Sequence, residues 1–178
     1  MTSVRQNLID RHLDLHLHPV IIDEAEGTAT FYIWNLSGCL LGYQQYRPSV
    51  KEKKTNDPKS SRYFTYSRGG SLLMWGLESF YLRNDVLFIT EGIFDACRLT
   101  ALGYPAVALL TCHPPKDTKN WFSCLPFRRV IAICDKDENG SGKKLAKFGS
   151  ESYFLDSKDL GDATDVEVED LLCRVGVL

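Results

Sequence analysis

Residues 86–95 read Val-Leu-Phe-Ile-Thr-Glu-Gly-Ile-Phe-Asp, an apolar run of strand length that leads directly into an acidic turn. Residues 130–137, Val-Ile-Ala-Ile-Cys-Asp-Lys-Asp, repeat this pattern. Short apolar runs bounded by turn residues are typical of strands buried in a sheet. In open α/β sheets, ligands bind at the carboxyl ends of the strands, and Mg²⁺ prefers carboxylate oxygens. The sequence therefore predicts a divalent-metal site made of Glu91, Asp135 and Asp137.

The alternation of strands and helices predicts the fold class of the second half. Apolar periodicity favours strands at 86–90, 106–110, 130–134 and 153–155, and helices at 93–102, around Trp121, at 143–148 and at 165–175. Strands that alternate with helices are typical of a parallel sheet covered on both faces. Right-handed crossovers would place the ends of the first and third strands on one edge. We therefore expect an α/β fold with a parallel sheet of about four strands flanked by helices.

The first half has a different pattern. Residues 28–36 and 39–46 have the composition of strands, and the Ser37-Gly38 pair between them is typical of a hairpin turn. The polar stretch 47–62 predicts a long loop. We therefore expect a small α+β subdomain with a basic loop at 1–83, followed by a catalytic domain at 84–178.

Charge and composition limit the possible functions. The 178 residues carry a net charge of −2, so any nucleic-acid contact must use a local patch. Residues 43–68 offer one, with seven Lys or Arg against two acidic residues. No apolar run is long enough to span a bilayer, and the first residues lack the apolar core of a signal peptide. We therefore expect a cytoplasmic protein without membrane contact. The six cysteines form no C-x-x-C pair, which argues against a zinc ribbon.

The acidic residues of the two turns also have ordinary structural interpretations. Glu91 suits the start of a helix, where the helix dipole favours a negative charge. Asp95, one helical turn later, either orients the site or is a simple first-turn acid. Asp135 and Asp137 suit a polar turn, although two like charges so close together are costly without a cation or basic group. Three acids at two neighbouring strand ends favour the functional interpretation.

Other candidate motifs are weaker. The segment 158–165 has two interpretations. In one, Asp159 or Asp162 supplies a further metal ligand; in the other, Asp162 or Thr164 caps the following helix. The segment 135–140 fits only the first half of a calcium-binding EF-hand loop, because its twelfth position is an alanine. Gly142-Lys143 lacks the remaining residues of a phosphate-binding P-loop. Three early histidines have no cysteine partners, and we expect a surface or capping role for them: His12, His16 and His18.

Together these acidic segments resemble the Toprim domain, which is shared by bacterial and phage-type primases, topoisomerases, and some nucleases and recombination proteins. The resemblance rests on Glu91–Asp95, Asp135–Asp137 and Lys158-Asp159, and it covers roughly residues 84–172. The preceding half narrows the choice, because Gly38–Arg47 and the segments 61–65 and 72–77 resemble parts of a primase catalytic region. The chain is thus most similar to the catalytic, RNA polymerase, domain of bacterial or phage-type DNA primases.

The resemblance implies a DNA-directed RNA polymerase of the primase type, a nucleotidyltransferase that synthesises short RNA primers on single-stranded DNA. Its metal, Mg²⁺ or Mn²⁺, would bind Glu91, Asp135 and Asp137, with Asp159 as a further ligand. Gly92 and Asp95 would support them. The implied partners are a single-stranded DNA template, ribonucleoside triphosphates and a separate replicative helicase. Contacts to template or nucleotide are implied for these basic residues: Arg47, Lys51, Lys59, Arg62 and Lys143.

Two other functions stay open. A Toprim site also serves metal-dependent nucleases and nicking enzymes, and a degenerate site serves non-catalytic DNA-binding proteins of recombination or replication. The zinc module that usually accompanies such primases is not found among these 178 residues. Tyr43, Tyr46 and Tyr63 either stack on bases or pack on the strand pair.

Overall fold

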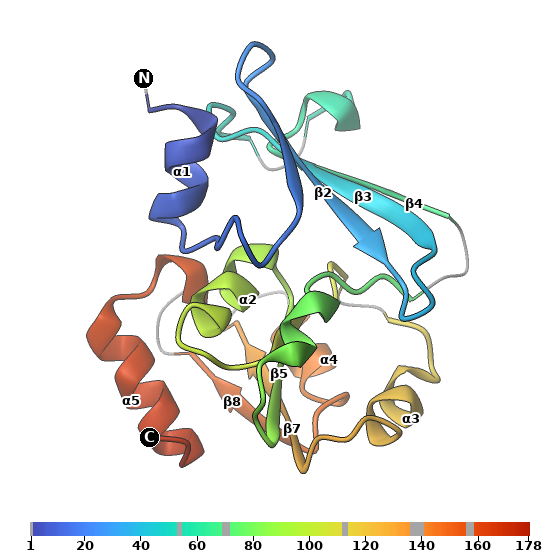
Figure 1. Ribbon diagram of the computed structural model, residues 1–178, viewed down its shortest axis with the longest axis vertical. Coiled ribbons are helices and arrows are strands. Elements are labelled where there is room, and N and C mark those ends of the chain that lie inside the picture. Colours follow the sequence, from blue (N-terminus) through green and yellow to red (C-terminus); the bar gives the residue numbers. More distant parts are fainter. Residues whose placement is uncertain (1, 53–54, 69–71, 112–113, 136–140, 156–158) are drawn as a thin grey trace.

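The computed structural model describes residues 2–52, 55–68, 72–111, 114–135, 141–155 and 159–178, apart from the side chain of Ser141. Two four-stranded sheets form its framework, one antiparallel and one parallel (Figure 1). The strand orders are β1-β2-β3-β4 and β6-β5-β7-β8. Within these described segments, none of the helices has the length and apolar character needed to cross a bilayer.

The antiparallel sheet belongs to the first half of the chain. It consists of β1 (Val20–Asp23), β2 (Thr28–Trp34), β3 (Leu40–Tyr46) and β4 (Tyr63–Ser67). The predicted hairpin between β2 and β3 is confirmed. The Asn35 Oδ1 atom accepts hydrogen bonds from the amides of Ser37 and Cys39 at 3.0 and 2.9 Å, and Gly38 adopts a positive φ of 75° that favours glycine.

Several elements of this half were not predicted from the pattern. They are α1 (Val4–Asp10), β1, β4 and the 3₁₀ turn η1 (Pro58–Ser60), which lies inside the predicted loop. The edge strand β4 has largely exposed side chains and no apolar alternation. Its conformation is fixed by pairing with β3, in which Tyr43 faces Tyr66, and such pairing does not show in local composition.

The parallel sheet confirms the predicted α/β class. Its strands are β5 (Val86–Thr90), β6 (Ala106–Ala108), β7 (Arg129–Cys134) and β8 (Glu151–Phe154). The second predicted strand ends two residues early and the fourth begins two residues early. The remaining elements are α2 (Ile93–Thr100), α3 (Thr118–Ser123), α4 (Ser141–Leu145), α5 (Asp165–Val175), and the 3₁₀ helices η2 (Leu77–Tyr81) and η3 (Leu160–Asp162).

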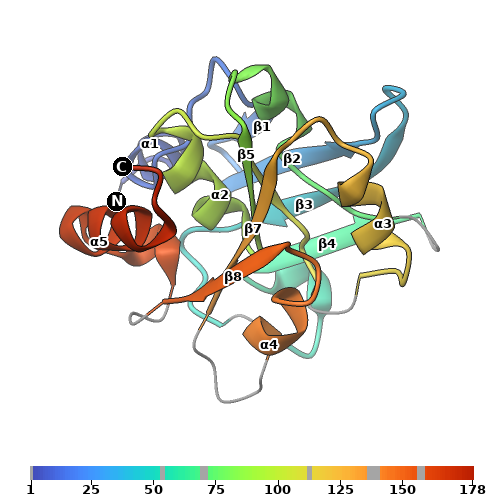
Figure 2. The ribbon, with the colours of Figure 1, turned by 90° about the horizontal axis from the view of Figure 1, so that it is seen from below.

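Alternate residues of the parallel strands face two separate hydrophobic cores. Phe88 and Ile131 pack with α2, α5 and Phe31 of the antiparallel sheet. Leu87 and its neighbours on the other face pack with residues of α3 and α4, including Phe122. Helices therefore cover both faces of the sheet (Figure 2). The first core joins residues from both halves of the chain, and the boundary between 1–83 and 84–178 stays a prediction.

Candidate active site

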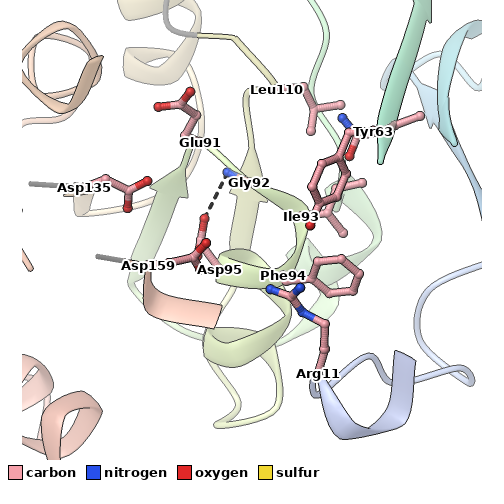
Figure 3. A pocket seen from close by; sticks show the side chains of 11 residues that line it. Arg11, Tyr63, Glu91, Gly92, Ile93, Phe94, Asp95, Leu110, Asp135 and Asp159 are labelled. Carbon is pink, nitrogen blue, oxygen red and sulfur yellow. Dashed lines mark hydrogen bonds between the residues drawn. The ribbon is translucent and has the colours of Figure 1, made fainter. Parts of the chain in front are cut away.

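Two acidic turns lie at the carboxyl end of the parallel sheet. The strands β5 and β7 are parallel neighbours, with Phe88 opposite Ile131. Glu91 follows the last residue of β5, and Asp135 follows the last residue of β7. Both side chains line one cavity of about 220 Å³ (Figure 3). The predicted meeting of these two strand ends is therefore present in the structure, while Asp137 lies outside the described residues.

A third turn reaches the same cavity through Asp95. The buried Asp95 carboxylate accepts a hydrogen bond from the Gly92 amide at Oδ2, at 3.1 Å (Figure 3). Its Oδ1 atom accepts another from the Gly161 amide, at 2.9 Å. Gly161 follows Asp159, which also lines the cavity. Asp95 thus ties the turn that carries Glu91 to the turn that carries Asp159.

A steric requirement explains why the residue after Glu91 is a glycine. A Cβ atom on Gly92 would lie 2.7 Å from the Asp95 Oδ2 atom. That distance is too short for a real contact, so a larger residue would push the carboxylate away from the amide it accepts from. In the sequence Glu-Gly-x-x-Asp, the glycine therefore leaves room for the side chain of the buried aspartate.

Burial and the neighbouring carboxylates raise the pKa of Asp95. The pKa of Asp95 lies well above its ordinary value, first because the group is buried and then because Asp159 and Asp135 are negatively charged. Burial, followed by the charges of Asp135 and Glu91, raises the pKa of the Cys134 thiol to about 12. The cavity therefore concentrates negative charge and favours a bound cation.

The structure shows which residues after β8 cap a helix and which line the cavity. Thr164 is the N-cap of α5, and its hydroxyl pairs with Glu167 in a capping box. Asp162 is largely exposed and lies 3.3 Å from an Arg11 nitrogen. Asp159 is the one of the two aspartates that lines the cavity. It also caps η3, because its Oδ1 atom accepts a hydrogen bond from the Gly161 amide at 2.9 Å.

The oxygen donors around the cavity suit a hard divalent cation. Glu91, Asp135 and Asp159 present carboxylates, which Mg²⁺ and Mn²⁺ prefer over nitrogen or sulfur. Among the described side chains, no three His, Cys, Asp or Glu residues are close enough to hold one ion together. The described residues thus supply the donor chemistry of a metal site, and the metal-binding roles stay predictions.

Arg11 is a cavity residue that the sequence did not single out. It follows α1, and its guanidinium lies 4.0 Å above the centre of the Phe94 ring. The side chain is 13% exposed, and its Nε atom is buried without a hydrogen-bond partner. Arg11 therefore brings a positive charge to the acidic cavity (Figure 3). No local pattern marks it, because the contact depends on how α1 packs against the second half of the chain.

The other predicted basic residues lie at different places. Arg62 lies 5.9 Å from the ring centre of Tyr63, a residue that lines the cavity. Arg47 instead contacts the side chain of Gln45 and the carbonyl of Ser61. The three predicted lysines are exposed and are not among the described residues that line the cavity: Lys51, Lys59 and Lys143.

The expectation for the early histidines is wrong for His18, which is buried. Its ring centre lies 4.4 Å from that of Trp75, and its Nδ1 atom lies 2.6 Å from a Glu78 carboxylate oxygen. Its Nε2 atom lies 3.3 Å from the hydroxyl of Thr100. His18 therefore joins the N-terminal segment to the second half through a buried polar contact.

Comparisons with known proteins identify solved structures that share this fold. No protein-family model and no curated protein sequence matches the chain. A structure of the DnaG primase catalytic domain bound to single-stranded DNA matches 97% of this chain and 58% of that one, at 20% identity and a TM-score of 0.61. The RNA polymerase domain of Mycobacterium tuberculosis primase DnaG matches 95% of this chain and 62% of that one, at 18% identity and a TM-score of 0.59.

A phage protein shows the same similarity. The primase fragment of the bacteriophage T7 primase-helicase protein matches 85% of this chain and 62% of its own length, at 17% identity and a TM-score of 0.55. The chain thus spans about three fifths of each of these solved structures. At such identities the similarity establishes the fold, and the chain accordingly has the fold of DnaG and phage primase catalytic domains.

Proposed function

We propose that the chain is a primase-type nucleotidyltransferase that synthesises short RNA primers on single-stranded DNA. The observation that carries the proposal is the convergence of Glu91, Asp135 and Asp159 on one cavity at the carboxyl end of the parallel sheet. The fold shared with primase catalytic domains supports it. Asp137 lies two residues after Asp135 in the sequence, and we include it among the proposed metal ligands.

The acidic residues would hold Mg²⁺ or Mn²⁺. When bound, such ions neutralise triphosphate charge and make the attacking 3′-hydroxyl a better nucleophile. The part of Asp95 is to hold the turns of Glu91 and Asp159 together through the Gly92 and Gly161 amides. Fixed turns keep the carboxylates at constant positions, which lowers the reorganisation that the reaction requires.

Two arginines would bind phosphate beside the carboxylates. Arg11 lines the cavity, and Arg62 approaches it through Tyr63. A guanidinium keeps its charge at all physiological pH values and binds phosphate oxygens with two parallel hydrogen bonds. Lys51, Lys59 and Lys143 would add sequence-independent attraction to the DNA backbone. In this arrangement the triphosphate lies between the arginines and the acids.

A primer-synthesis assay tests the proposal directly. Single-stranded template, four ribonucleotides with one labelled, and Mg²⁺ or Mn²⁺ should yield short labelled oligoribonucleotides. The double variant Glu91→Gln/Asp135→Asn should lose this activity and should also lose the thermal stabilisation produced by the metal. The matched control, Glu169→Gln/Asp170→Asn on the exposed face of α5, removes the same charges elsewhere and should keep both.

The same experiment separates the alternative functions. Plasmid and single-stranded DNA incubated with metal but without nucleotides reveal nicking, and nicks without primers would indicate a nuclease. Metal stabilisation that persists in the double variant would contradict the proposed metal site. One similar structure is a fragment of a primase-helicase protein, so a replicative helicase is a candidate partner to add where the chain alone makes no primers.

A further inference from the structure

The antiparallel sheet carries a row of aromatic residues on the face turned away from the parallel sheet. Tyr32 on β2 lies directly opposite Tyr43 on β3, and Tyr43 lies opposite Tyr66 on β4. Side chains alternate between the two faces of a strand. The neighbouring Phe31 and Gln44 are buried toward the core, so the three tyrosines share the opposite face.

The rings of this row contact one another across the strands. The Tyr43 and Tyr66 rings are stacked, with centroids 5.6 Å apart and planes inclined by 28°. Phe64 adds a ring 6.1 Å from Tyr43, and Trp34 adds one 5.9 Å from Tyr32. We call four of these residues the outer aromatic face: Tyr32, Tyr43, Phe64 and Tyr66. Trp34 follows a register shift in β2 and lines a different cavity with Met74 and Trp121.

This face is open to solvent. Tyr66 is 55% exposed, and α2 with the parallel sheet lies on the other side of the antiparallel sheet (Figure 1). Cross-strand ring contacts stabilise a sheet, which accounts for Tyr43 in the middle of the row. It does not account for Tyr66, which lies on an edge strand with half of its surface in water. Contiguous exposed apolar groups usually mark a binding surface.

The charge around the face indicates the chemistry of the partner. Arg47 directly follows β3, and its guanidinium contacts Gln45, which lies on the same face as Tyr43. The exposed Arg68 directly follows β4. Flat exposed rings beside fixed positive charges fit single-stranded nucleic acid, whose unpaired bases stack while its phosphates meet the cations.

The outer aromatic face is separate from the acidic cavity. Gln44 and Tyr63 line the cavity from the inner face of the sheet, whereas Tyr43 and Phe64 lie beside them on the outer face. The two sites are thus divided by the thickness of one sheet, whose free edge is β4.

We propose that the outer aromatic face binds single-stranded DNA by base stacking and holds the template outside the acidic cavity. The proposal builds on the template requirement of the proposed function, but the binding itself needs neither metal nor nucleotide. The contact is tolerant of sequence, since every base offers a flat face. Duplex DNA, in which the bases are already stacked on one another, is a poor ligand for this face.

Binding of a labelled oligothymidine, followed by fluorescence anisotropy in EDTA, tests the proposal. Replacing the exposed ring in Tyr66→Leu should weaken binding about fivefold or more, the order expected for one lost stack, while Tyr66→Phe keeps the ring and the affinity. The control Tyr81→Leu removes a tyrosine that is 68% exposed on η2, and it should bind as the unmodified protein does. Circular dichroism and thermal unfolding confirm that each variant is folded.

An abasic oligonucleotide of equal length and charge separates stacking from simple attraction. It should bind the unmodified protein much more weakly than oligothymidine and should be insensitive to Tyr66→Leu. Equal affinity for both oligonucleotides, or normal oligothymidine binding by Tyr66→Leu, would overturn the proposal. Ring-dependent binding without primer synthesis would support DNA binding by the outer aromatic face and contradict the proposed function. Primer synthesis together with unaltered DNA binding by Tyr66→Leu would support the proposed function and contradict DNA binding by this face.

Discussion

The substitution Asp95→Asn tests whether the buried carboxylate joins two turns of the acidic cavity. Asp95 accepts hydrogen bonds from the amides of Gly92 and Gly161, at 3.1 and 2.9 Å. Asparagine has the same shape but carries an NH2 group in place of one oxygen, which cannot accept from the amide it faces. The part-buried Gly92 amide would then lose its acceptor, or the Gly161 amide would keep only its bond to the Asp159 Oδ1 atom. A buried donor without a partner costs about 1 to 3 kcal/mol. We expect the free energy of unfolding to fall by up to that amount below pH 3.8, measured by urea titration in EDTA.

The pH dependence of this loss has a definite sign. The folded-state pKa of Asp95 is raised above the ordinary value near 3.8, chiefly by burial. Its stabilising contribution is therefore complete below pH 3.8 and is lost as pH rises through the raised pKa, at about 1.4 kcal/mol per pH unit. Asparagine does not titrate, so the stability gap between the two proteins should narrow as pH rises above 3.8.

The control for this measurement is Asp170→Asn, an exposed acid on α5, which should change stability by less than about 0.5 kcal/mol at every pH. A gap between the Asp95→Asn and unmodified proteins that is constant with pH, or that widens, would refute the raised pKa. An unchanged free energy of unfolding at about pH 3.5 would refute the two amide contacts. Primer synthesis should also fall in Asp95→Asn, since the turns of Glu91 and Asp159 lose one tie.

Two further substitutions probe the site and its support. In Gly142→Ala the new Cβ would lie 2.3 Å from the backbone oxygen of Asp135. We therefore expect stability to fall by about 1 to 3 kcal/mol and primer synthesis to fall more steeply, as measured by thermal unfolding and by turnover. Unchanged turnover would contradict the placement of Asp135. His18→Ala should cost about 2 to 4 kcal/mol of unfolding free energy, because it empties a buried space beside Trp75; the exposed His16→Ala is its control, and equal urea midpoints for the two would show that the contact is dispensable.

The local sequence predicted the elements that depend on local chemistry. The apolar run 86–90 was predicted as a strand and forms one, because its residues favour burial and the acidic turn that follows ends the strand. The hairpin at Gly38 follows from a backbone conformation that glycine adopts readily. The edge strand β4 did not show in the pattern, since its partner β3 lies across a long connection. Pairing over that distance is decided by the sheet as a whole.

The three tyrosines of the first half show the same limit. Tyr43, Tyr46 and Tyr63 are equivalent candidates for base stacking in the sequence. Strand register places Tyr43 on the outer face, whereas Tyr46 is fully buried and Tyr63 lines the acidic cavity. A shift of one residue in register would exchange the faces, so the role of each ring is a property of the folded sheet.

The sequence by itself determined the α/β class and the positions of Glu91 and Asp135 at two strand ends, because strand propensity and acidic turns are encoded within about ten residues. Only the tertiary structure decided that Asp95 bonds the Gly161 amide and that Arg11 enters the cavity. Those contacts join residues 66 or more positions apart, and packing of α1, α2 and η3 against one another brings them together. Distance along the chain hides such contacts from any local pattern, whereas the hydrophobic core shared by both halves fixes them in space.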